Sequence, residues 1–577
     1  MSVGLVGSGP ATEAVEAALG DVDRRVERVG VADLSAHELG VVVDQAGSGT
    51  FGRANELTRE SATTWIAVEL GGVGGYPVAD AAVSGIDPTG GCYDCLSARV
   101  GSNVDPDAEP QGPPDDPTVR FAGAVAGRLA TRFFDPGAES IHRAVVELPH
   151  ADRTFLPVPG CACGEGRDRA LGRDHVDRSL EETLARAEMG VDGRVGIVSE
   201  VGEVDSHPAP YYLAHLCDTG EFADATAGRQ AAGVDPGWNA AFMKALGEAF
   251  ERYCAGVYRD AEFRTGTPAA VENPVAPSAF VGPDPGTAAA PDGREAVDAA
   301  DRRWVPGEDL HTGESVMLPA ELVHYPPPER SIKPAITTGL GLGNSTVEAL
   351  LSGLYEVIER DAATLGWYST YDPLELVVED EDYETLAART GTEGVEVTAL
   401  LLTQDVDVPV VCVVAEHDEW PRLAAATAAH LDPATAARDA LAEAVQNWVE
   451  LRRMGPEDAA SAGGAIGRYA TDPGPAAAFA DADQRIPADS VGPEAVPSGE
   501  QHLTAVLDRL SDAGLDAYAA RTTTRDVDSL GFETVRALLP AAQPLFFGDP
   551  FFGRRAETVP DDLGYEPRLD RVHHPFP

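Results

Sequence analysis

The sequence is short of basic residues, and above all of lysine. Of 577 residues, 43 are basic and 95 are acidic, which gives a net charge of -52, and lysine occurs only at Lys244 and Lys333. Binding to nucleic-acid phosphates requires clustered lysine and arginine, so nucleic acid is not expected as a partner. Because 43% of the residues are hydrophobic, the chain is expected to fold and not to remain disordered.

The same imbalance indicates the setting of the protein. A folded, acidic and lysine-poor protein suits a cytoplasm of very high salt, where screening weakens the repulsion between carboxylates. We therefore predict a salt-loving source and a cytoplasmic location. Acidic helix faces are common in such a protein, so acidity alone does not identify a site.

Long apolar runs and a secretion signal are also missing. The run at 408–414 is far too short to cross a bilayer. The sequence opens with MSVGLVGSGP, which lacks the basic, apolar and small-residue pattern of a signal peptide. No membrane association is expected. In a cytoplasmic chain, cysteines favour metal binding or chance positions over disulfides, and the isolated Cys217, Cys254 and Cys412 are expected in the core.

The remaining cysteines form two close pairs. Cys92 and Cys95 are separated by two residues, and Cys161 and Cys163 by one. Four thiolates suit tetrahedral zinc, so we predict a structural zinc site that staples a loop-rich region. Reduced, unliganded thiols are the alternative.

Length and patterning predict an α/β (α+β) protein with more than one domain. We expect a small Rossmann-like α/β domain at 1–85, a cysteine-containing zinc-staple and linker region at 86–190, and a large α/β domain at 191–577. The first domain would begin with a buried strand at 3–6 and a helix at 11–19. Thr12 replaces the third glycine of a dinucleotide-binding fingerprint, which favours a structural domain without a nucleotide.

Within the large domain, composition predicts several further elements. Strands are expected at 395–402 and 408–414, and a helix at about 433–453. Residues 264–300 and 455–500 are rich in proline, alanine and glycine, so we expect an exposed connection and a surface insertion there.

The segment 337–367, TTGLGLGNSTVEALLSGLYEVIERDAATLGW, predicts a glycine-rich loop that leads into a long helix. At about 100° per residue, Asn344, Glu348, Glu356 and Glu359 fall within roughly a third of the helix circumference. Gathered carboxylates repel one another unless a cation lies among them, which favours a divalent-metal and nucleotide site. The alternatives are an ordinary acidic face and, for Glu348, a helix-capping role.

Two other segments repeat this polar pattern. Each has an acid followed three residues later by an acid or amide; the pairs are Glu248/Glu251 in ALGEAFERY, Glu356/Glu359 in GLYEVIERD and Glu443/Gln446 in ALAEAVQNW. That spacing puts each pair on one helix face, and the repetition indicates a shared cavity. Lys244 lies one turn before the first pair and Lys333 just before the glycine loop, so a phosphate-facing role for either is a hypothesis; chance survival is the alternative.

At these residues the sequence resembles the YcaO family, specifically its ATP-dependent peptide cyclodehydratases with a fused amino-terminal domain. GLGLGNSTVEALLSGLYEVIERDA is close to the central signature of that family, LGEAFERY and ALAEAVQ resemble its flanking helices, and the ending Pro575-Phe576-Pro577 resembles its proline-rich tail. The resemblance covers roughly 190–577. The first part, with CYDCLSAR, resembles a shortened ubiquitin-activating-enzyme-like partner domain.

The resemblance implies an ATP and magnesium site without a phosphate-binding loop. The residues implied to line it are Glu248, Glu251, Arg252, Asn344, Glu348, Glu356, Glu359, Arg360, Glu443 and Gln446, and we add Lys244. The predicted magnesium ligands among them are Glu251, Glu348, Glu356 and Glu359. The predicted catalytic residues are Arg252 and Arg360, together with His573, His574 and Pro577 of the terminal tail.

The sequence departs from the family pattern in places. Gly228-Arg229-Gln230-Ala231 stands where a Gly-Lys-Gly loop is usual, Lys244 replaces a small hydroxyl residue, Asp439 stands where a basic residue is expected, and His573 where a further proline is common. These departures affect the predicted ATP contacts of the loop and of the third helix, but not the metal-binding acids.

The resemblance implies an enzyme that uses ATP and magnesium to form azoline rings from Cys, Ser or Thr of a ribosomally made peptide, as in the biosynthesis of thiazole/oxazole-modified bacteriocins. The alternatives are thioamide formation and a non-catalytic scaffold that binds a precursor peptide. The precursor peptide is the expected partner. The sequence does not decide whether the enzyme needs a separate leader-binding or dehydrogenase partner, or whether it forms a homodimer.

Overall fold

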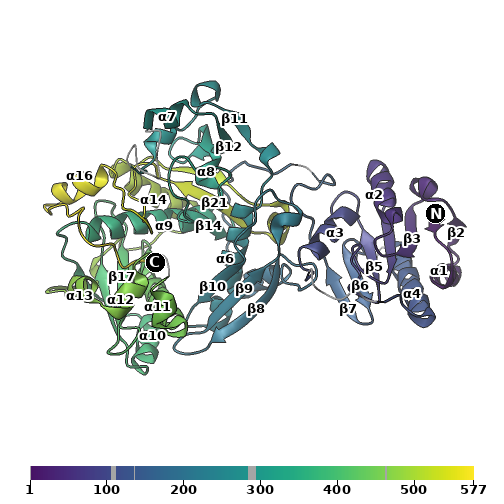
Figure 1. Ribbon diagram of the computed structural model, residues 1–577, viewed down its shortest axis with the longest axis horizontal. Helices are drawn as coiled ribbons and strands as arrows, with labels where there is room; N and C mark the ends of the chain where they lie inside the picture. The colour runs from purple at the N-terminus through teal and green to yellow at the C-terminus, as the bar shows by residue number, and fades with distance from the viewer. Residues whose placement is uncertain are drawn as a thin grey trace.

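The computed structural model describes residues 2–105, 112–135, 137–138, 140–164, 166–283, 294–461 and 464–577. Within them the chain forms an amino-terminal unit at one end of an elongated molecule and a larger unit at the other (Figure 1). None of the helices formed by these residues is long and apolar enough to cross a membrane.

The amino-terminal unit is built on a sheet with strand order β2-β1-β3-β4-β5-β6-β7, parallel from β1 to β4 and antiparallel beyond. Its strands are β1 (Ser2–Val6), β2 (Arg25–Arg28), β3 (Leu39–Gln45), β4 (Trp65–Leu70), β5 (Ala81–Ile86), β6 (Ala144–Leu148) and β7 (Ala151–Thr154). The helices are α1 (Pro10–Gly20), α2 (Gly49–Ser61), α3 (Tyr93–Gly101) and α4 (Asp116–Phe133). Helices α1 and α4 pack together on one face, and α2 and α3 contact each other at the other. Central strand β4 is therefore buried along its whole length.

The predicted strand at 3–6 and helix at 11–19 are confirmed as β1 and α1. Gly7 has a φ of 116°, and a Cβ there would lie 2.5 Å from the Val43 carbonyl oxygen. Close packing of the turn on β3 therefore accounts for this glycine without a nucleotide. The predicted boundary at residue 85 differs from the observed sheet, because β6 pairs with β5 and brings residues 144–154 into the same unit.

The larger unit contains the other sheets of the described residues. The first has order β10-β9-β8 and consists of β8 (Val198–Asp205), β9 (Tyr211–Leu216) and β10 (Gln230–Val234). The second has order β11-β12-β20-β21-β14, with β13 on β12: β11 (Arg264–Gly266), β12 (Arg302–Asp309), β13 (Ser315–Pro319), β14 (Leu340–Gly343), β20 (Tyr518–Arg521) and β21 (Glu533–Leu538). The third has order β18-β17-β16-β15-β19: β15 (Leu374–Val377), β16 (Glu396–Leu401), β17 (Val410–Glu416), β18 (Leu423–Ala429) and β19 (Arg485–Pro487). The strands expected at 395–402 and 408–414 are confirmed as β16 and β17.

The helices of this unit lie against these sheets. The long ones are α6 (Trp238–Gly256), α9 (Thr346–Trp367) and α11 (Pro433–Ala459), and α11 confirms the helix expected at 433–453. The shorter ones are α5 (Leu180–Glu188), α7 (Arg294–Ala299), α8 (Ala320–Val323), α10 (Glu381–Gly391), α12 (Ile466–Thr471), α13 (Gly474–Ala480), α14 (Glu500–Asp512), α15 (Arg525–Leu530) and α16 (Arg555–Asp562). Helix α9 packs between β14 and β21 of one sheet and β17 and β18 of another, so it is buried on most of its circumference.

The predicted glycine-rich loop before α9 is wrong, because this segment is strand β14 paired with β21. The glycines let the helix lie directly on the strand. A Cβ on Gly341 would lie 2.2 Å from the Ala349 carbonyl oxygen, and one on Gly353 would lie 2.6 Å from the Gly339 carbonyl oxygen. A strand that alternates Leu and Gly therefore serves as the packing surface of the helix.

The two proline- and alanine-rich segments are also more structured than predicted. In the expected insertion at 455–500, Tyr469 and Phe479 are buried, and β19 extends a sheet by pairing with β15. In the expected connection at 264–300, β11 pairs with β12 and α7 spans Arg294–Ala299. Residues 284–293 of that segment lie outside the described part of the chain. Small alanine-rich helices give little periodic signal, which explains the misassignment.

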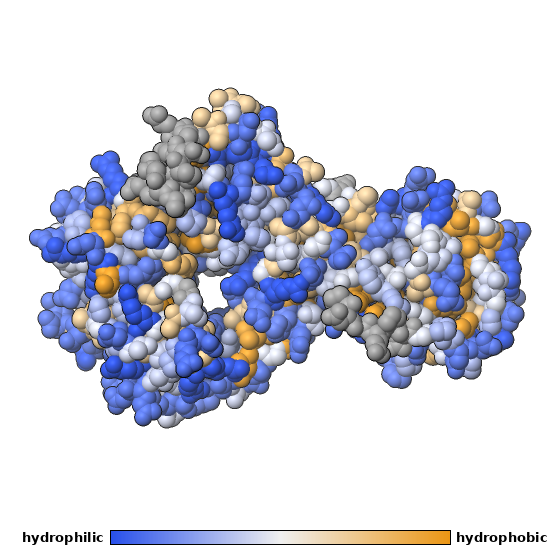
Figure 2. Space-filling model, in the orientation of Figure 1, coloured by the Kyte–Doolittle hydropathy of each residue, from blue (hydrophilic) through white to orange (hydrophobic). Residues whose placement is uncertain are grey.

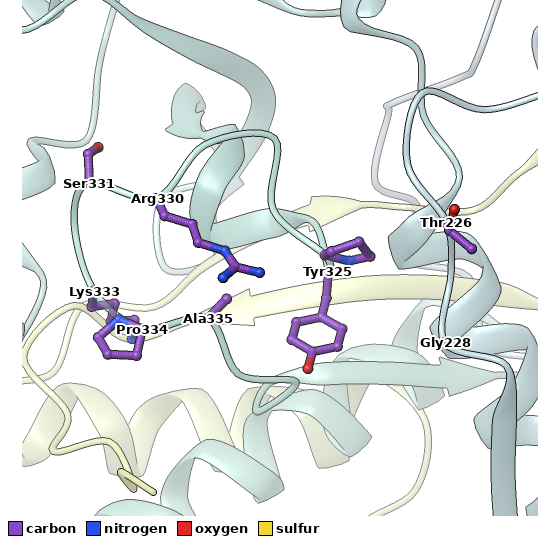
Figure 3. A pocket seen from close by; sticks show the side chains of 9 residues that line it. Thr226, Gly228, Tyr325, Arg330, Ser331, Lys333, Pro334 and Ala335 are labelled. Atoms are coloured by element: carbon purple, nitrogen blue, oxygen red, sulfur yellow. The ribbon is translucent and has the colours of Figure 1, made fainter. Parts of the chain in front are cut away.

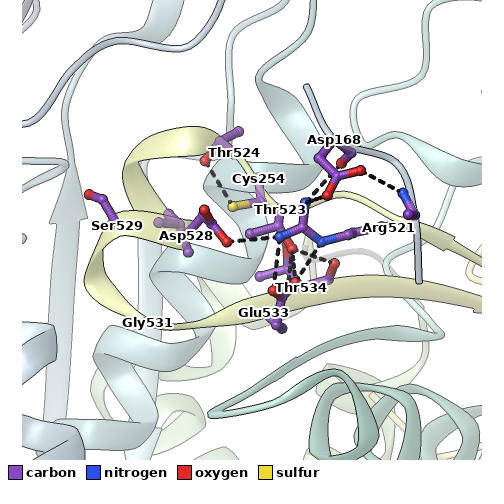
Figure 4. A network of polar contacts seen from close by, with 12 residues as sticks. Asp168, Cys254, Arg521, Thr523, Thr524, Asp528, Ser529, Gly531, Glu533 and Thr534 are labelled. Carbon is purple, nitrogen blue, oxygen red and sulfur yellow. Dashed lines mark hydrogen bonds and ion pairs between the residues drawn. The ribbon is translucent and has the colours of Figure 1, made fainter. Parts of the chain in front are cut away.

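A buried ion pair joins the two units. Arg99 on α3 and Asp526 on α15 form a salt bridge in which neither side chain is exposed. Tyr253 of α6 donates a 2.6 Å hydrogen bond to the same carboxylate. Beside it, Arg521 donates to Glu533, Asp528 and the Asp168 carbonyl, which fixes the segment after the cysteine pairs against β20 and β21 (Figure 4).

Replacing Asp526→Asn is expected to lower the free energy of unfolding by about 3–5 kcal/mol, because it leaves the Arg99 guanidinium buried without a counter-charge. Denaturant titration followed by circular dichroism measures the change. The matched control is Glu13→Gln, which removes an exposed ion pair with Arg120 and should cost no more than about 1 kcal/mol. Equal effects of the two substitutions would contradict the structural role given to the buried pair.

Candidate functional site

The three long helices α6, α9 and α11 converge on a cleft of about 730 Å³. In the space-filling view an opening lies between the regions of α6 and α11, and the carboxyl terminus lies close to it (Figures 1 and 2). The cleft is polar. Its charged and amide side chains are Lys244, Glu248, Glu251 and Arg252 from α6, Glu356, Glu359 and Arg360 from α9, and Asp439, Glu443 and Gln446 from α11.

Helical spacing positions these groups. On α6, Lys244, Glu248 and Glu251 follow one another at intervals of four and three residues, so they share one face. On α11, Asp439, Glu443 and Gln446 have the same intervals. The opposite faces of both helices carry small or apolar residues that pack on the sheets. The prediction that three distant pairs, two of acids and one of an acid and an amide, share a cavity is confirmed.

Burial and mutual repulsion shape the electrostatics of the cleft. Burial, and then the charges of Glu356 and Glu248, raise the pKa of Glu251 to about 8. Burial also raises the pKa of Glu359 to about 8, with Arg360 opposing the rise and Glu443 adding to it. The pKa of Glu443 is raised chiefly by burial. A cation that enters the cleft would therefore stabilise the ionised form of these carboxyl groups.

Three of these acids accept a hydrogen bond from a neighbouring group. The Ala232 N–H donates a 2.6 Å hydrogen bond to Glu248, and the Gly339 N–H donates a 3.0 Å bond to Glu356. The Thr427 hydroxyl on β18 donates a 2.5 Å bond to Glu359. These contacts orient one oxygen of each carboxylate. Sequence reasoning missed Thr427, because the alanine-rich strand β18 has no polar pattern that singles it out.

Two positions at which the sequence departs from the expected family pattern are in contact. The Lys244 Nζ lies 3.1 Å from the Asp439 carboxylate across the gap between α6 and α11, and 3.0 Å from Asp235. Lys244 is therefore the cation at this end of the cleft, and two carboxylates hold it in place.

The terminal tail is ordered and reaches the cleft. Arg360 Nη1 donates a 2.7 Å hydrogen bond to the backbone oxygen of Pro577, which lines the cleft. His574 is fully buried outside the cleft lining, where its Nε2 lies 2.9 Å from the Phe546 carbonyl oxygen, and burial lowers its pKa to about 3. The His573 carbonyl accepts a 2.5 Å hydrogen bond from Tyr469. Of the three predicted tail residues, only Pro577 lines the cleft.

Asn344 and Glu348 lie at the start of α9 and are not among the residues that line the cleft. Glu348 accepts a 2.8 Å hydrogen bond from the Asn344 N–H, while its own N–H donates to the Ser345 hydroxyl. Glu348 precedes Glu356 by eight residues, about 12 Å along the helix axis. Ser345 thus caps the helix, but the capping box is incomplete, because the Glu348 carboxylate accepts from Asn344 and not from the Ser345 N–H. The predicted metal role of Glu348 stays a prediction.

The paired cysteines form a compact cluster at the joint between the units. The Sγ atoms of Cys92, Cys95, Cys161 and Cys163 all lie within 4.8 Å of one another. The measured Sγ–Sγ distances are 3.5 Å for Cys92–Cys161 and for Cys95–Cys163, and 4.0 Å for Cys92–Cys95. A tetrahedral zinc site with Zn–S bonds of about 2.3 Å has sulfur–sulfur edges of about 3.8 Å. The predicted core positions of Cys217, Cys254 and Cys412 are confirmed.

A family model described as YcaO cyclodehydratase, ATP- and Mg2+-binding, matches residues 233–543. The match covers more than half of the 577 residues. The chain belongs to the YcaO family. It is 29% identical over 338 residues to an uncharacterized protein of Methanothermobacter thermautotrophicus, an alignment that covers 54% of this chain and 82% of the relative.

Two solved heterocyclase structures share the fold along nearly the whole chain. A heterocyclase in complex with substrate and cofactor superposes with a TM-score of 0.75 at 20% identity, covering 100% of this chain and 85% of that one. The heterocyclase TruD gives a TM-score of 0.65 at 18% identity, with coverages of 98% and 82%. The amino-terminal unit is therefore part of the shared fold.

The cleft fits the ATP and Mg2+ that the YcaO family binds. Carboxylate oxygens are the protein ligands that Mg2+ prefers, and burial raises the pKa values of Glu251 and Glu359 to about 8 in the absence of a cation. Arg360 points its Nε at Glu359 from 3.4 Å without a hydrogen bond, so a buried donor is left for a further acceptor. No phosphate-binding glycine loop is needed if cations mediate the contact with the phosphates.

The raised pKa values predict how stability depends on pH in the absence of divalent ions. Because Glu251 titrates near 8 when folded, against a reference value of 4.5, the folded state binds more protons than the unfolded chain between these pH values. The free energy of unfolding should therefore fall as pH rises from about 4.5 to about 8.

Denaturant titrations in a chelator across this pH range test the effect. Glu251→Gln should flatten the pH dependence, and Mg2+ should raise the free energy of unfolding most at pH 8, where the carboxylates are ionised. An unchanged pH slope in the variant would contradict the electrostatic description of the cleft.

Proposed function

We propose that the cleft between α6, α9 and α11 binds Mg2+ and ATP and activates a backbone amide of a ribosomally made peptide, so that a Cys, Ser or Thr side chain closes an azoline ring. The observation that carries this proposal is the convergence of Glu248, Glu251, Glu356, Glu359 and Glu443 on one cleft in a chain of the YcaO family. Membership of the family supports ATP and Mg2+, and the full-length likeness to heterocyclase folds supports the ring-forming outcome.

The acids and the cations of the cleft would have separate tasks. Glu251, Glu356 and Glu359 present oxygens from two helices to the same space, and we assign them as magnesium ligands. Glu248 is already neutralised by Arg252, which donates to it directly, and is assigned to orient that guanidinium. Lys244 and Arg360 stand on different walls of the cleft, where each can interact with a phosphate oxygen.

When bound, ATP supplies the phosphoryl group that converts the amide oxygen into a leaving group. The residues of the cleft would hold the reacting groups together. The peptide side chain would lose its proton as it adds to the preceding carbonyl carbon, the amide oxygen would leave as phosphate, and loss of the amide proton would complete the C=N bond of the ring. Pro577 and Arg360 lie in contact at the cleft wall, so the tail is assigned to keep the Arg360 guanidinium in place during this step.

Two single substitutions of cleft carboxyls, with an exposed acid as control, test the metal site. Glu359→Gln on α9 and Glu443→Gln on α11 should each lower magnesium-dependent ATP turnover at least about a hundredfold, because each removes a carboxyl group that lines the cleft. Glu457→Gln changes an exposed acid beyond the break in α11 at Gly455, outside the cleft lining, and should keep near-normal turnover. Turnover that survives in Glu359→Gln would contradict the assigned site.

Product mass separates the alternatives. Loss of one water from a cysteine-containing peptide indicates an azoline, and exchange of oxygen for sulfur in the presence of a sulfide donor indicates a thioamide. A chain that binds the peptide but turns over no ATP would be a scaffold. The raised pKa values and the convergence of acids are costly features that a peptide scaffold does not need, which favours the enzyme.

We also propose that the four-cysteine cluster holds structural zinc. Its support is the set of sulfur separations, which bracket the edge of a tetrahedral zinc site, and the position of Arg525 with Nη2 3.6 Å from the Cys163 sulfur. A positive charge there balances part of the negative charge that four thiolates and one Zn2+ carry. The site joins α3 to the segment before α5, so the metal would hold the two units together.

Elemental analysis is expected to find about one zinc per chain, from the tetrahedral set of four thiolates. Cys95→Ser should lose the metal and lower the melting temperature, whereas Cys412→Ala, which alters a buried thiol outside the cluster, should keep it. Full zinc content in Cys95→Ser would contradict the proposed site.

A further inference from the structure

A second cavity, of about 540 Å³, opens beside the cleft. It is lined by the segment 330–335, by Tyr325 and Pro326, and by Thr226 and Gly228 from the loop before β10. Figure 3 shows the Arg330 side chain extending from one wall of this pocket towards Tyr325. We call it the basic pocket, because its charged lining residues are Arg330 and Lys333.

Neither cation of the basic pocket has a polar partner in the part of the chain that the structure describes. Among the described residues, neither Arg330 nor Lys333 makes a hydrogen bond or an ion pair, although acids outnumber bases by 95 to 43 in the sequence. The nearby carboxylate of Glu321 is engaged with the Ser331 and Ile332 N–H groups and the Ser331 hydroxyl. Burial and the charge of Arg536 lower the pKa of Lys333 to about 8, and Glu321 opposes this only in part.

The basic pocket adjoins the proposed reaction cleft. Tyr325 and Ala335 line both cavities. The segment 333–335 also borders an apolar cavity of about 300 Å³ that contains Phe546 and Phe551. A peptide substrate with an amide in the cleft would therefore lie close to the segment 333–335, which has the basic pocket on one side and aromatic residues on the other.

Resting on the proposed function, we propose that the basic pocket binds a carboxylate of the peptide substrate, from an acidic residue close in sequence to the residue that forms the ring. The guanidinium of Arg330 suits a carboxylate, since its planar fork accepts two oxygens. The phosphates of ATP are a less suitable occupant, because the acids that gather their cations line the neighbouring cleft and none lines this pocket. Unpaired cations beside a reaction site thus select substrates with a negative charge.

The scarcity of lysine provides a direct test. Labelling lysine side chains with 13C at Cε gives signals from Lys244 and Lys333 alone, which Lys244→Arg and Lys333→Arg assign. The probes are capped peptides that hold one cysteine and a single aspartate at different distances from it, with asparagine-matched controls. They are titrated in the presence of Mg2+ and a non-hydrolysable ATP analogue.

At least one aspartate peptide should shift the Lys333 signal and raise the pKa that it reports towards the ordinary lysine value, and its asparagine counterpart should not. Arg330→Gln should weaken binding of that peptide about tenfold or more and leave the asparagine control unchanged. Arg120→Gln, which alters an exposed arginine of the amino-terminal unit, should change neither.

Two outcomes would overturn the proposal: a Lys333 signal that no aspartate peptide moves, or one that inorganic phosphate moves and aspartate peptides do not. Lys244 reports separately on the cleft, since it lies on the cleft wall beside Glu248. If Mg2+ and the ATP analogue leave its signal unchanged, the proposed function fails, while Lys333 still decides the occupant of the basic pocket.

Discussion

The burial of several carboxyl groups in one cleft is the constraint on which the arrangement of the larger unit depends. Burial first, and the charges of neighbouring carboxylates second, raise the pKa values of Glu251, Glu359 and Glu443. Such a cluster costs stability in the unliganded protein, so it persists only because the surrounding packing imposes it. That packing is extensive: α9 is buried between two sheets, and the glycines of β14 let it lie on backbone. Cations that bind in the cleft are expected to restore the free energy of unfolding that the buried carboxyl groups cost.

Several basic residues of the protein pair with acids at the junctions between its elements. Lys244 bridges α6 and α11 through its ion pair with Asp439. Arg99 neutralises Asp526 where the two units meet. Arg330 and Lys333 differ from these residues, because they line a pocket beside the cleft without an ion pair to any described residue. Acids outnumber bases by 95 to 43 in the sequence, yet neither Arg330 nor Lys333 has a partner among the described residues.

Much of the site could be predicted from sequence because it depends on helical spacing. The acid pairs lie three residues apart on segments with a clear apolar face, so both their helices and their shared cavity followed from periodicity. The two cysteine pairs could also be recognised from sequence, because the two residues of each pair are close in the chain. Contacts between distant segments could not be predicted: β6 joining the first sheet, β14 replacing a loop, and Thr427 reaching Glu359 all depend on strand pairing. The salt-loving source and the metal role of Glu348 stay predictions.

The most direct test of the central claim is a structure of the protein with Mg2+ and a non-hydrolysable ATP analogue. The account predicts magnesium ions about 2.1 Å from carboxylate oxygens of Glu251, Glu356 and Glu359, bridging to the phosphates. Lys244 and Arg360 should then lie on the phosphate side of the cleft. Nucleotide bound elsewhere, or a cleft whose acids remain protonated and free of metal at saturating Mg2+, would contradict it.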